Sequence, residues 1–507
     1  MLCDVTYQRL TIRLMASTLL LIGASSCGGV DIRPFLAFEA PVVALANVRI
    51  IDGSGRPGRD NQTIVIQSDR IAAVGDSGAI AVPAGAKVLE LGGRTVLPGF
   101  VGMHDHLFYQ VADNSVFPSQ ESFAMLYLAT GVTTIRTAGA LDFRGDLHIK
   151  RLIDEGRHPG PTIHITSPYL YAVGEAPDPQ RIANQVNGWA DDGATSFKAY
   201  MSLRRDELAA AINVAHQRGL KVTGHLCAVG FRDAASLGID NLEHGLFADT
   251  EFYTGKEPDQ CPNPSPVLGE LQSLDIAGPQ VRQLISLLVR RGVSVTSTLA
   301  IFETFAANAQ LDPRTLDVLT PKLQELYRAE QAKREDPDAE GGSAWRRLLT
   351  KEMEFERAFV AAGGRLLAGS DPTGWGGIVA GFGNQRQVEL LVGAGLPAEQ
   401  AIRIASANGA DFLQDEDIGR VAQGLQADLI VVTGNPSVSI SDIRNVELVF
   451  RKGLAYDPKR LIAATNGTVG RLNMGIYYRS PYMWLAGLLL AIILARRLWR
   501  RFGPAPD

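Results

Sequence analysis

The sequence has few cysteines and histidines and no excess of positive charge. Its 507 residues include 4 cysteines and 8 histidines, and its formal charge at pH 7 is −5. If an N-terminal leader is removed, only Cys227 and Cys261 are left, so no disulfide framework can be inferred, and a single bridge stays open. Lysines and arginines are scattered, which argues against a surface that follows phosphates. We therefore expect no nucleic-acid partner.

The two ends of the chain differ from the middle. Residues 1–27 have arginines, then an apolar run, then small residues, which predicts a signal peptide or an N-terminal anchor. An uncharged run followed by arginines predicts a transmembrane helix and basic tail over residues 480–499. The positive-inside rule then predicts a membrane-anchored protein with its main body on the extracytoplasmic, periplasmic side.

Between these ends the pattern is nested. Short alternating strands with Gly-rich turns in residues 42–98 and 416–460 predict two parts of one composite β-sandwich. Apolar strands alternate with helices over residues 99–415, which is typical of a (β/α)8 TIM-like barrel. The expected fold class is therefore α/β, with the barrel, the β-sandwich and the C-terminal transmembrane helix, the last joined through a linker over residues 461–479.

Two histidines stand at the end of an apolar run in "VLPGFVGMHDHLFY". Because side chains alternate along a strand, His104 and His106 would share one face and make half of a metal site. Other potential ligands also stand at predicted strand ends, and barrel strands end on the same side. These are Lys198, His225, His244 and Asp371. Such nitrogen and oxygen donors suit zinc and related ions, with positions open for water.

Lys198 raises an electrostatic problem, because an ammonium group would be repelled by two divalent cations. A carbamate formed with CO2 would instead make Lys198 an anionic oxygen donor that bridges both ions. The alternative is an ordinary core or ion-paired lysine.

The segments "LPGFVGMHDH", "FKAY", "VTGHL", "LEHG" and "AGSDPTG", with the flanking strands, resemble the amidohydrolase superfamily. The resemblance is closer to its imidazolonepropionase-related and prolidase-like branch. It implies two divalent ions, zinc by expectation, with His104, His106 and Asp371 on the first ion. His225 and His244 would hold the second ion, and carbamylated Lys198 would bridge them. A metal-bridging hydroxide would then attack the scissile carbonyl, and Asp371 would pass its proton to the leaving amine.

Four further residues are candidates for the site. Tyr200 shares the Lys198 face of its strand and would donate to the developing oxyanion, or it simply packs. Arg136 would bind a substrate carboxylate, or form a structural ion pair. His164 would contact substrate if its strand turns it inward. Relatives often have "HRELELLV" where this chain has "QRQVELLV", so Gln385 is a candidate substrate contact with altered chemistry.

We therefore expect a metal-dependent amidohydrolase, possibly dipeptidase-like in its substrates, which cleaves the C–N bond of a small amide or peptide. The expected partners are that substrate and, through the C-terminal helix, a membrane; a homo-oligomer stays open. One alternative is a mononuclear cyclic-imide hydrolase or deaminase, in which His104, His106, His225 and Asp371 bind one ion and His244 polarises the substrate. Another is a catalytically silent membrane-tethered binding protein.

Overall fold

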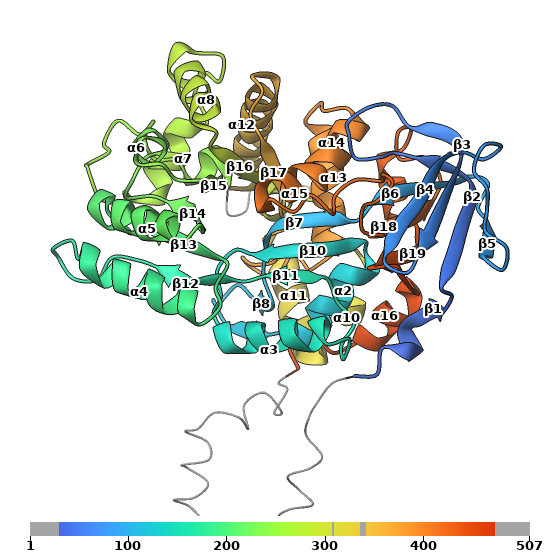
Figure 1. Ribbon diagram of the computed structural model, residues 1–507. Helices are drawn as coiled ribbons and strands as arrows, with labels where there is room; N and C mark the ends of the chain where they lie inside the picture. Colours follow the sequence, from blue (N-terminus) through green and yellow to red (C-terminus); the bar gives the residue numbers. More distant parts are fainter. Residues whose placement is uncertain (1–29, 307–308, 335–340, 472–507) are drawn as a thin grey trace, which may run out of the picture. The chain divides into compact units, whose positions relative to one another are not determined.

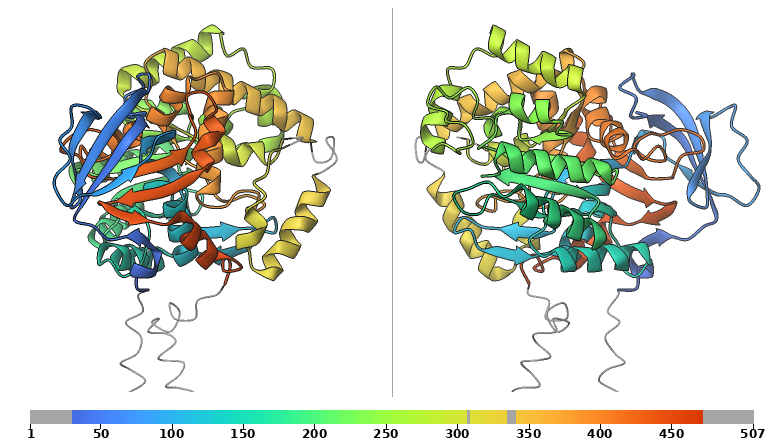
Figure 2. Two further views of the ribbon diagram at one scale, coloured as in Figure 1. Left: turned by 90° about the vertical axis from the view of Figure 1, so that its right-hand side faces the viewer. Right: turned by 60° about the vertical axis from the view of Figure 1, so that its left-hand side comes forward.

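Strands from both flanks of the chain form one sheet. The computed structural model describes residues 30–306, 309–334 and 341–471, and Ile32–Arg471 form one compact unit. In Figures 1 and 2 the early and late strands lie side by side at one end of this unit. The order across the sheet is β1 (Leu36–Phe38), β20 (Leu454–Tyr456), β19 (Val446–Arg451), β18 (Leu429–Thr433), β6 (Arg94–Pro98), β2 (Val42–Ile50), β3 (Arg59–Gln67) and β4 (Arg70–Asp76), while β5 (Lys87–Glu90) pairs with β2.

The two flanks meet where β18 runs antiparallel to β6. Val431 lies opposite Val96 in this pair, and both side chains belong to the apolar core of the sheet. Branched apolar residues suit this position because they pack well on a pleated, buried surface. β6 ends at Pro98 and the next strand begins at Phe100, so the sheet leads directly into the barrel.

The barrel consists of a three-stranded and a six-stranded parallel sheet. Its strands are β7 (Phe100–Asp105), β10 (Val132–Thr137), β11 (Thr162–His164), β12 (Thr166–Leu170), β13 (Ser196–Met201), β14 (Lys221–Leu226), β15 (Asn241–Glu243), β16 (Ser294–Ser297) and β17 (Leu366–Ala368). β11 and β12 are halves of one strand interrupted at Ile165, since β11 pairs with β10 and β12 with β13. The segments therefore correspond to the eight strands of a (β/α)8 barrel.

Helices lie around the barrel strands (Figure 1). They are α2 (Gln120–Ala129), α3 (Phe143–Asp154), α4 (Pro179–Asp191), α5 (Arg205–Gln217), α6 (Phe231–Leu237), α7 (Pro264–Leu271), α8 (Pro279–Arg291), α9 (Leu299–Glu303), α10 (Thr315–Val318), α11 (Pro321–Lys333), α12 (Gly342–Ala361), α13 (Phe382–Gly393), α14 (Ala398–Ile404) and α15 (Ala407–Leu413). The short elements are η1 (Arg33–Phe35), η2 (Gly245–Ala248), η4 (Ile440–Arg444), β8 (Phe108–Gln110) and β9 (Val116–Pro118). The helices bury their apolar stripes against the strands, as Leu208 and Ile212 of α5 do in the main core.

The barrel closes between its last strand and its first. The backbone N–H of Asp371 donates to the carbonyl of His104 at 2.9 Å. Gly369 permits this approach, because a Cβ at that position would lie 2.3 Å from the His104 Cβ. Closure therefore brings the residues that follow β17 directly against the end of β7.

The prediction of a membrane span is corrected by the structure. Across residues 30–306, 309–334 and 341–471, no helix combines the length and apolar character needed to cross a bilayer. The fold class of the described residues is therefore mixed α/β, and nothing in them supports the predicted transmembrane helix, the membrane-anchored location or the membrane partner. The segments on which those predictions depended, 1–27 and 480–499, lie outside the described residues.

The chain after the composite sheet also differs from the expectation. Residues 461–479 were expected to form a linker, but the described part of that segment packs on the body. Helix α16 (Pro458–Thr465) buries Leu461 against Leu128 and Val449, and Val469 is fully buried. Apolar residues at these positions explain the packing, since a solvated linker would gain nothing from them.

Gly369→Ala tests the closure of the barrel. The added methyl group would overlap the backbone of β7, so the free energy of unfolding should fall by about 1–3 kcal/mol or more, as for other overpacked cores. Urea unfolding measures it. Gly393→Ala is the matched control, because nothing lies within 4 Å of its position, and alanine there should be neutral or stabilising. Equal stability of the two variants would contradict the close approach of β17 to β7.

Candidate metal centre

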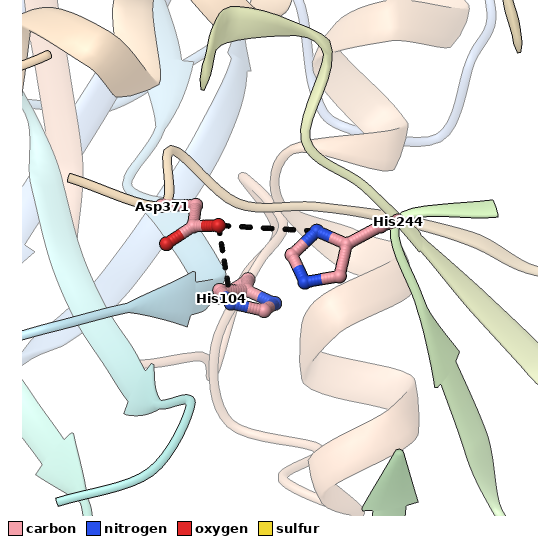
Figure 3. A group of neighbouring side chains, drawn as sticks. All are labelled: His104, His244 and Asp371. Atoms are coloured by element: carbon pink, nitrogen blue, oxygen red, sulfur yellow. Dashed lines mark ion pairs between the residues drawn. The ribbon is translucent and has the colours of Figure 1, made fainter. Parts of the chain in front are cut away.

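His104, His244 and Asp371 form a group that could hold a metal ion. One potential ligand atom from each residue lies within 4.8 Å of the others, and all three residues are buried. The Asp371 Oδ2 atom lies 3.7 Å from His104 Nε2 and 3.9 Å from His244 Nδ1. Figure 3 shows the carboxylate facing both imidazoles. Three donors of this kind match the protein ligands of a zinc site.

The other predicted ligands adjoin this group. His106 Nε2 lies 3.4 Å from Asp371 Oδ1, and the His225 ring lies 4.5 Å from that of His244. Lys198 Nζ lies 3.8 Å from Glu243. The structure therefore gathers all six predicted ligands at one end of the barrel.

Local backbone geometry turns two of the ligands inward. His244 has φ of 69° and Asp371 has φ of 48°, and both values lie in the left-handed region that residues with a Cβ seldom adopt. His244 Nδ1 is 2.8 Å from Thr298 Oγ1, and the Thr373 hydroxyl donates to Asp371 Oδ1 at 2.9 Å. These bonds fix both side chains, and left-handed conformations of this kind concentrate at functional sites.

The imidazoles of His104, His225 and His244 are neutral at physiological pH. Burial lowers the pKa of His104 to about 4 and that of His225 to about 3, and it holds the pKa of His244 well below its usual value. Burial opposes ionisation of Asp371, but His104 and the hydrogen bond to His106 outweigh it and hold its pKa well below the usual range. Neutral imidazoles and an ionised carboxylate are the forms that bind cations.

Lys198 is a buried amine that has no hydrogen-bond partner among the residues that the structure describes. Its side chain is 1% exposed, and its Nζ is among the buried polar atoms without a partner. Burial lowers the pKa of Lys198 to about 8, against the opposing effect of Glu243. Burying an amine without a hydrogen bond lowers the stability of the fold. A bound group that contacted Nζ would remove this cost.

Glu243 is the functional residue that the sequence patterns missed. Its Oε2 accepts from His104 Nδ1 at 2.7 Å, and its Oε1 accepts from Arg136 at 2.8 Å and from Thr223. Burial opposes ionisation of Glu243, but Lys198, Arg136 and His104 hold its pKa well below the usual range. The bond from His104 Nδ1 leaves Nε2 directed at Asp371, as second-layer partners of metal-bound histidines commonly do.

Arg136 forms a structural ion pair in the structure. Its guanidinium group is 1% exposed, and it binds Glu243 and donates through Nε to the Met103 carbonyl at 3.0 Å. These contacts match the ion-pair alternative of the sequence analysis. The hydrogen bonds of Arg136 to described residues go to Met103 and Glu243 and not to His104 or Asp371.

Tyr200 lies beside the predicted metal ligands. Its ring centroid is 5.2 Å from that of His225 and 4.8 Å from that of Tyr169. Burial and the Asp371 charge raise the pKa of Tyr200, so its hydroxyl stays protonated and can donate a hydrogen bond.

His164 and Gln385 do not join the cluster. The charged groups that act on His164 are Lys150, Asp415, Arg136 and Asp154, and its Nε2 is buried without a partner. The Gln385 amide donates to the Thr130 and Ile443 carbonyls at 3.2 Å each. Gln385 therefore joins α13 to the end of α2 and to η4.

The segment over residues 249–270, referred to here as the insert, is fastened to the loop that follows β14. Cys227 and Cys261 form a disulfide, which is the single bridge that the sequence left open. Lys256 Nζ donates to the carbonyls of Cys227 and Ala228 at 2.9 and 2.7 Å. Because β14 carries His225, the insert is joined to a strand of the metal centre.

Comparisons with known proteins agree with this geometry. The model of the amidohydrolase family matches residues 288–455. An imidazolonepropionase of Streptomyces avermitilis is 33% identical over 124 residues, which is 24% of this chain and 29% of that protein. The chain therefore aligns with less than a third of the length of this relative.

Solved structures show the same fold over a larger part of the chain. A candidate prolidase from Bifidobacterium longum has a TM-score of 0.61 and 24% identity, covering 84% of this chain and 98% of that one. A Xaa-Pro dipeptidase with bound methionine has a TM-score of 0.61 and 20% identity, covering 82% and 100%. At these identities the likeness is one of fold.

Glu243→Gln tests the buried charge network. The change leaves Arg136 and Lys198 without their anion, so the free energy of unfolding at pH 7 should fall by about 3–5 kcal/mol. Because folding lowers the Glu243 pKa, the ionised group stabilises the wild type above its unfolded pKa, and the difference between the proteins should shrink below about pH 4.3. Urea unfolding at several pH values measures this.

The matched control is Glu447→Gln. Glu447 pairs with Arg94 at 3.2 Å, but the side chains of Glu447 and Arg94 are 35% and 38% exposed. Exposed pairs contribute about 0–1 kcal/mol. Losses of equal size in the two variants would refute the central role of Glu243.

Proposed function

We propose, from the premise that the chain belongs to the amidohydrolase superfamily, that it is a metal-dependent hydrolase of an amide or peptide C–N bond. The predicted resemblance to this superfamily is confirmed by the family model and by the imidazolonepropionase relative. The observation that carries the proposal is the convergence of His104, His244 and Asp371 from three different barrel strands. The substrate is a small amide or peptide, and the fold shared with a Xaa-Pro dipeptidase supports this class.

The residues fit two divalent ions, with zinc proposed on the basis of the donor set. His104, His106 and Asp371 would hold one ion, and His225 and His244 the other. Lys198 would bridge them as a carbamate, and its unpartnered buried Nζ supports this role. Two bound zinc ions would supply a water molecule of lowered pKa and polarise the scissile carbonyl.

Two side chains of the site would move or hold protons. Asp371 is ionised, and the partners of its carboxylate among the described residues are the Thr373 hydroxyl and the neighbouring imidazoles. It is therefore placed to accept a proton and pass it to the leaving amine. Tyr200, protonated and beside His225, would donate to the substrate oxygen as negative charge develops there. Substrate contacts by Arg136, His164 and Gln385 stay predictions, because their hydrogen bonds and neighbours lie elsewhere.

A second candidate function is a mononuclear centre that acts on a cyclic imide. The likeness to imidazolonepropionase favours it. In that case Lys198 would stay an ion-paired lysine next to Glu243. The number of bound ions distinguishes the two functions.

Lys198→Ala is the direct test of the binuclear proposal. Purified protein stripped with a chelator and reloaded with zinc should bind about two ions per chain by atomic emission. The variant should bind one ion or none and lose hydrolysis of dipeptides, because the anionic bridge is gone. Reloading in CO2-free buffer should lower the zinc content of the wild type, and added bicarbonate should restore it.

Lys221→Ala is the matched control. Lys221 begins the neighbouring strand β14 and lies over the Phe412 ring, 5.6 Å from its centroid, so its loss should leave the zinc content unchanged. One zinc per chain in the wild type, unaffected by Lys198→Ala, would favour the mononuclear function. No zinc binding in any protein would reject both.

A further inference from the structure

Aromatic side chains form a continuous wall beside the candidate metal centre. The wall consists of Phe247, Phe302, Phe305 and Trp345. Phe247 and Phe302 stack with ring centroids 3.7 Å apart, and the Trp345 ring lies 5.8 Å from Phe247 and 6.2 Å from Phe302. Phe305 extends the wall, with its centroid 5.1 Å from Trp345. The rings come from η2, α9, the segment after α9, and α12.

The wall is joined to the metal centre through His244. The Phe302 ring lies 5.7 Å from the His244 ring at an angle of 88°. Phe247 follows His244 by three positions in η2. Thr298, which binds His244 Nδ1, immediately precedes the helix that carries Phe302. A group held at the ions would therefore lie beside these rings.

The four rings are only partly buried. Each is of intermediate exposure. By contrast, core phenylalanines such as Phe355 and Phe359 are fully buried. Aromatic side chains prefer offset or edge contacts with further rings and bury large areas when covered. Rings needed only for packing would gain more by complete burial.

Loops that follow neighbouring barrel strands also expose apolar side chains. Leu141 follows β10 and is 53% exposed, and Tyr171 and Val173 follow β12 and are 51% and 53% exposed. These loops lie at the C-terminal ends of the strands, where the metal ligands also stand. Apolar surface thus occurs on two sides of the same barrel end.

We propose that the aromatic wall binds an apolar, preferentially aromatic, substituent of the amide substrate next to the scissile bond. The inference rests on the proposed function, since it names the substrate class of the same site. Phe302 and Trp345 are then specificity-determining residues, with Phe302 closer to the ions. The substituent would pack against the exposed parts of these rings and bury them.

The test compares matched substrates and matched metal-binding probes on the full-length, zinc-loaded protein. Hydrolysis of phenylalanyl-alanine, alanyl-phenylalanine and alanyl-alanine gives kcat/KM for each side of the bond. Calorimetric binding of phenylalanine hydroxamate and alanine hydroxamate gives the same comparison without turnover, because both probes carry the same metal-binding group. The proteins are the wild type, Phe302→Ala, Phe302→Leu, Trp345→Ala and the control Phe38→Ala. Phe38 is a partly buried phenylalanine of β1, whose ring contacts Phe450 in the composite sheet.

The wild type should prefer one phenylalanyl substrate and the phenylalanine probe by about tenfold or more, in line with a well-packed aromatic contact. Phe302→Ala and Trp345→Ala should each reduce that preference, while Phe38→Ala should retain it. Phe302→Leu keeps apolar volume and should give an intermediate preference, which a variant that merely misfolds would not. Zinc content should be unchanged throughout.

The outcomes separate the two proposals. If no dipeptide is hydrolysed but the hydroxamate preference depends on the wall, the proposed function fails and the aromatic subsite stands. If dipeptides are hydrolysed with no phenylalanyl preference, or with a preference that Phe302→Ala and Trp345→Ala leave unchanged, the subsite is refuted and the function stands. Absence of both hydrolysis and probe preference would overturn both.

Discussion

The organisation of the barrel end depends on one buried anion. Glu243 accepts hydrogen bonds from His104 and Arg136 and faces the Lys198 amine. Four other strands of the barrel thereby share a single carboxylate, because β7 contributes His104, β10 contributes Arg136, β13 contributes Lys198 and β14 contributes Thr223. Buried charges are tolerated when they are paired and hydrogen-bonded, and here the pairing also sets the direction in which the His104 ring presents its other nitrogen.

The sequence patterns predicted most of the residues that the structure gathers at the candidate metal centre, but not Glu243, which orients the His104 ring. His104, His106, His225, His244 and Asp371 stand at strand ends, so alternation and the barrel rule bring them together. Glu243 directly precedes His244, and strict alternation would place their side chains on opposite faces. The left-handed backbone of His244, with φ of 69°, ends that alternation and lets both side chains reach the centre. The packing around His244 sets this backbone conformation, so the alternation of side chains in the sequence does not predict it.

The sequence patterns also did not show which groups the candidate substrate-binding residues contact in the fold. Arg136 is a candidate because its guanidinium group suits a carboxylate, and Gln385 because it departs from the family pattern. In the structure both bond to buried groups of the protein itself. Which polar group a buried side chain meets depends on contacts between segments far apart in sequence, as between Gln385 and Ile443. The membrane span failed for another reason: hydropathy identified a segment that lies outside the described residues, and the described helices contain no such span.

The pairing of β6 with β18 has a consequence for how the chain acquires its structure. Arg94 at the start of β6 contacts Glu447, 353 positions later in the chain. The N-terminal strands of the sheet therefore cannot pair with the C-terminal strands until nearly the whole polypeptide has been synthesised. Contacts of such long range slow folding, and an unpaired strand edge is prone to associate with other chains meanwhile. During synthesis, the barrel emerges from the ribosome after the N-terminal strands of the composite sheet and before its C-terminal strands. Nascent chains that stop before residue 429 should therefore depend on chaperones in a way that the completed protein does not.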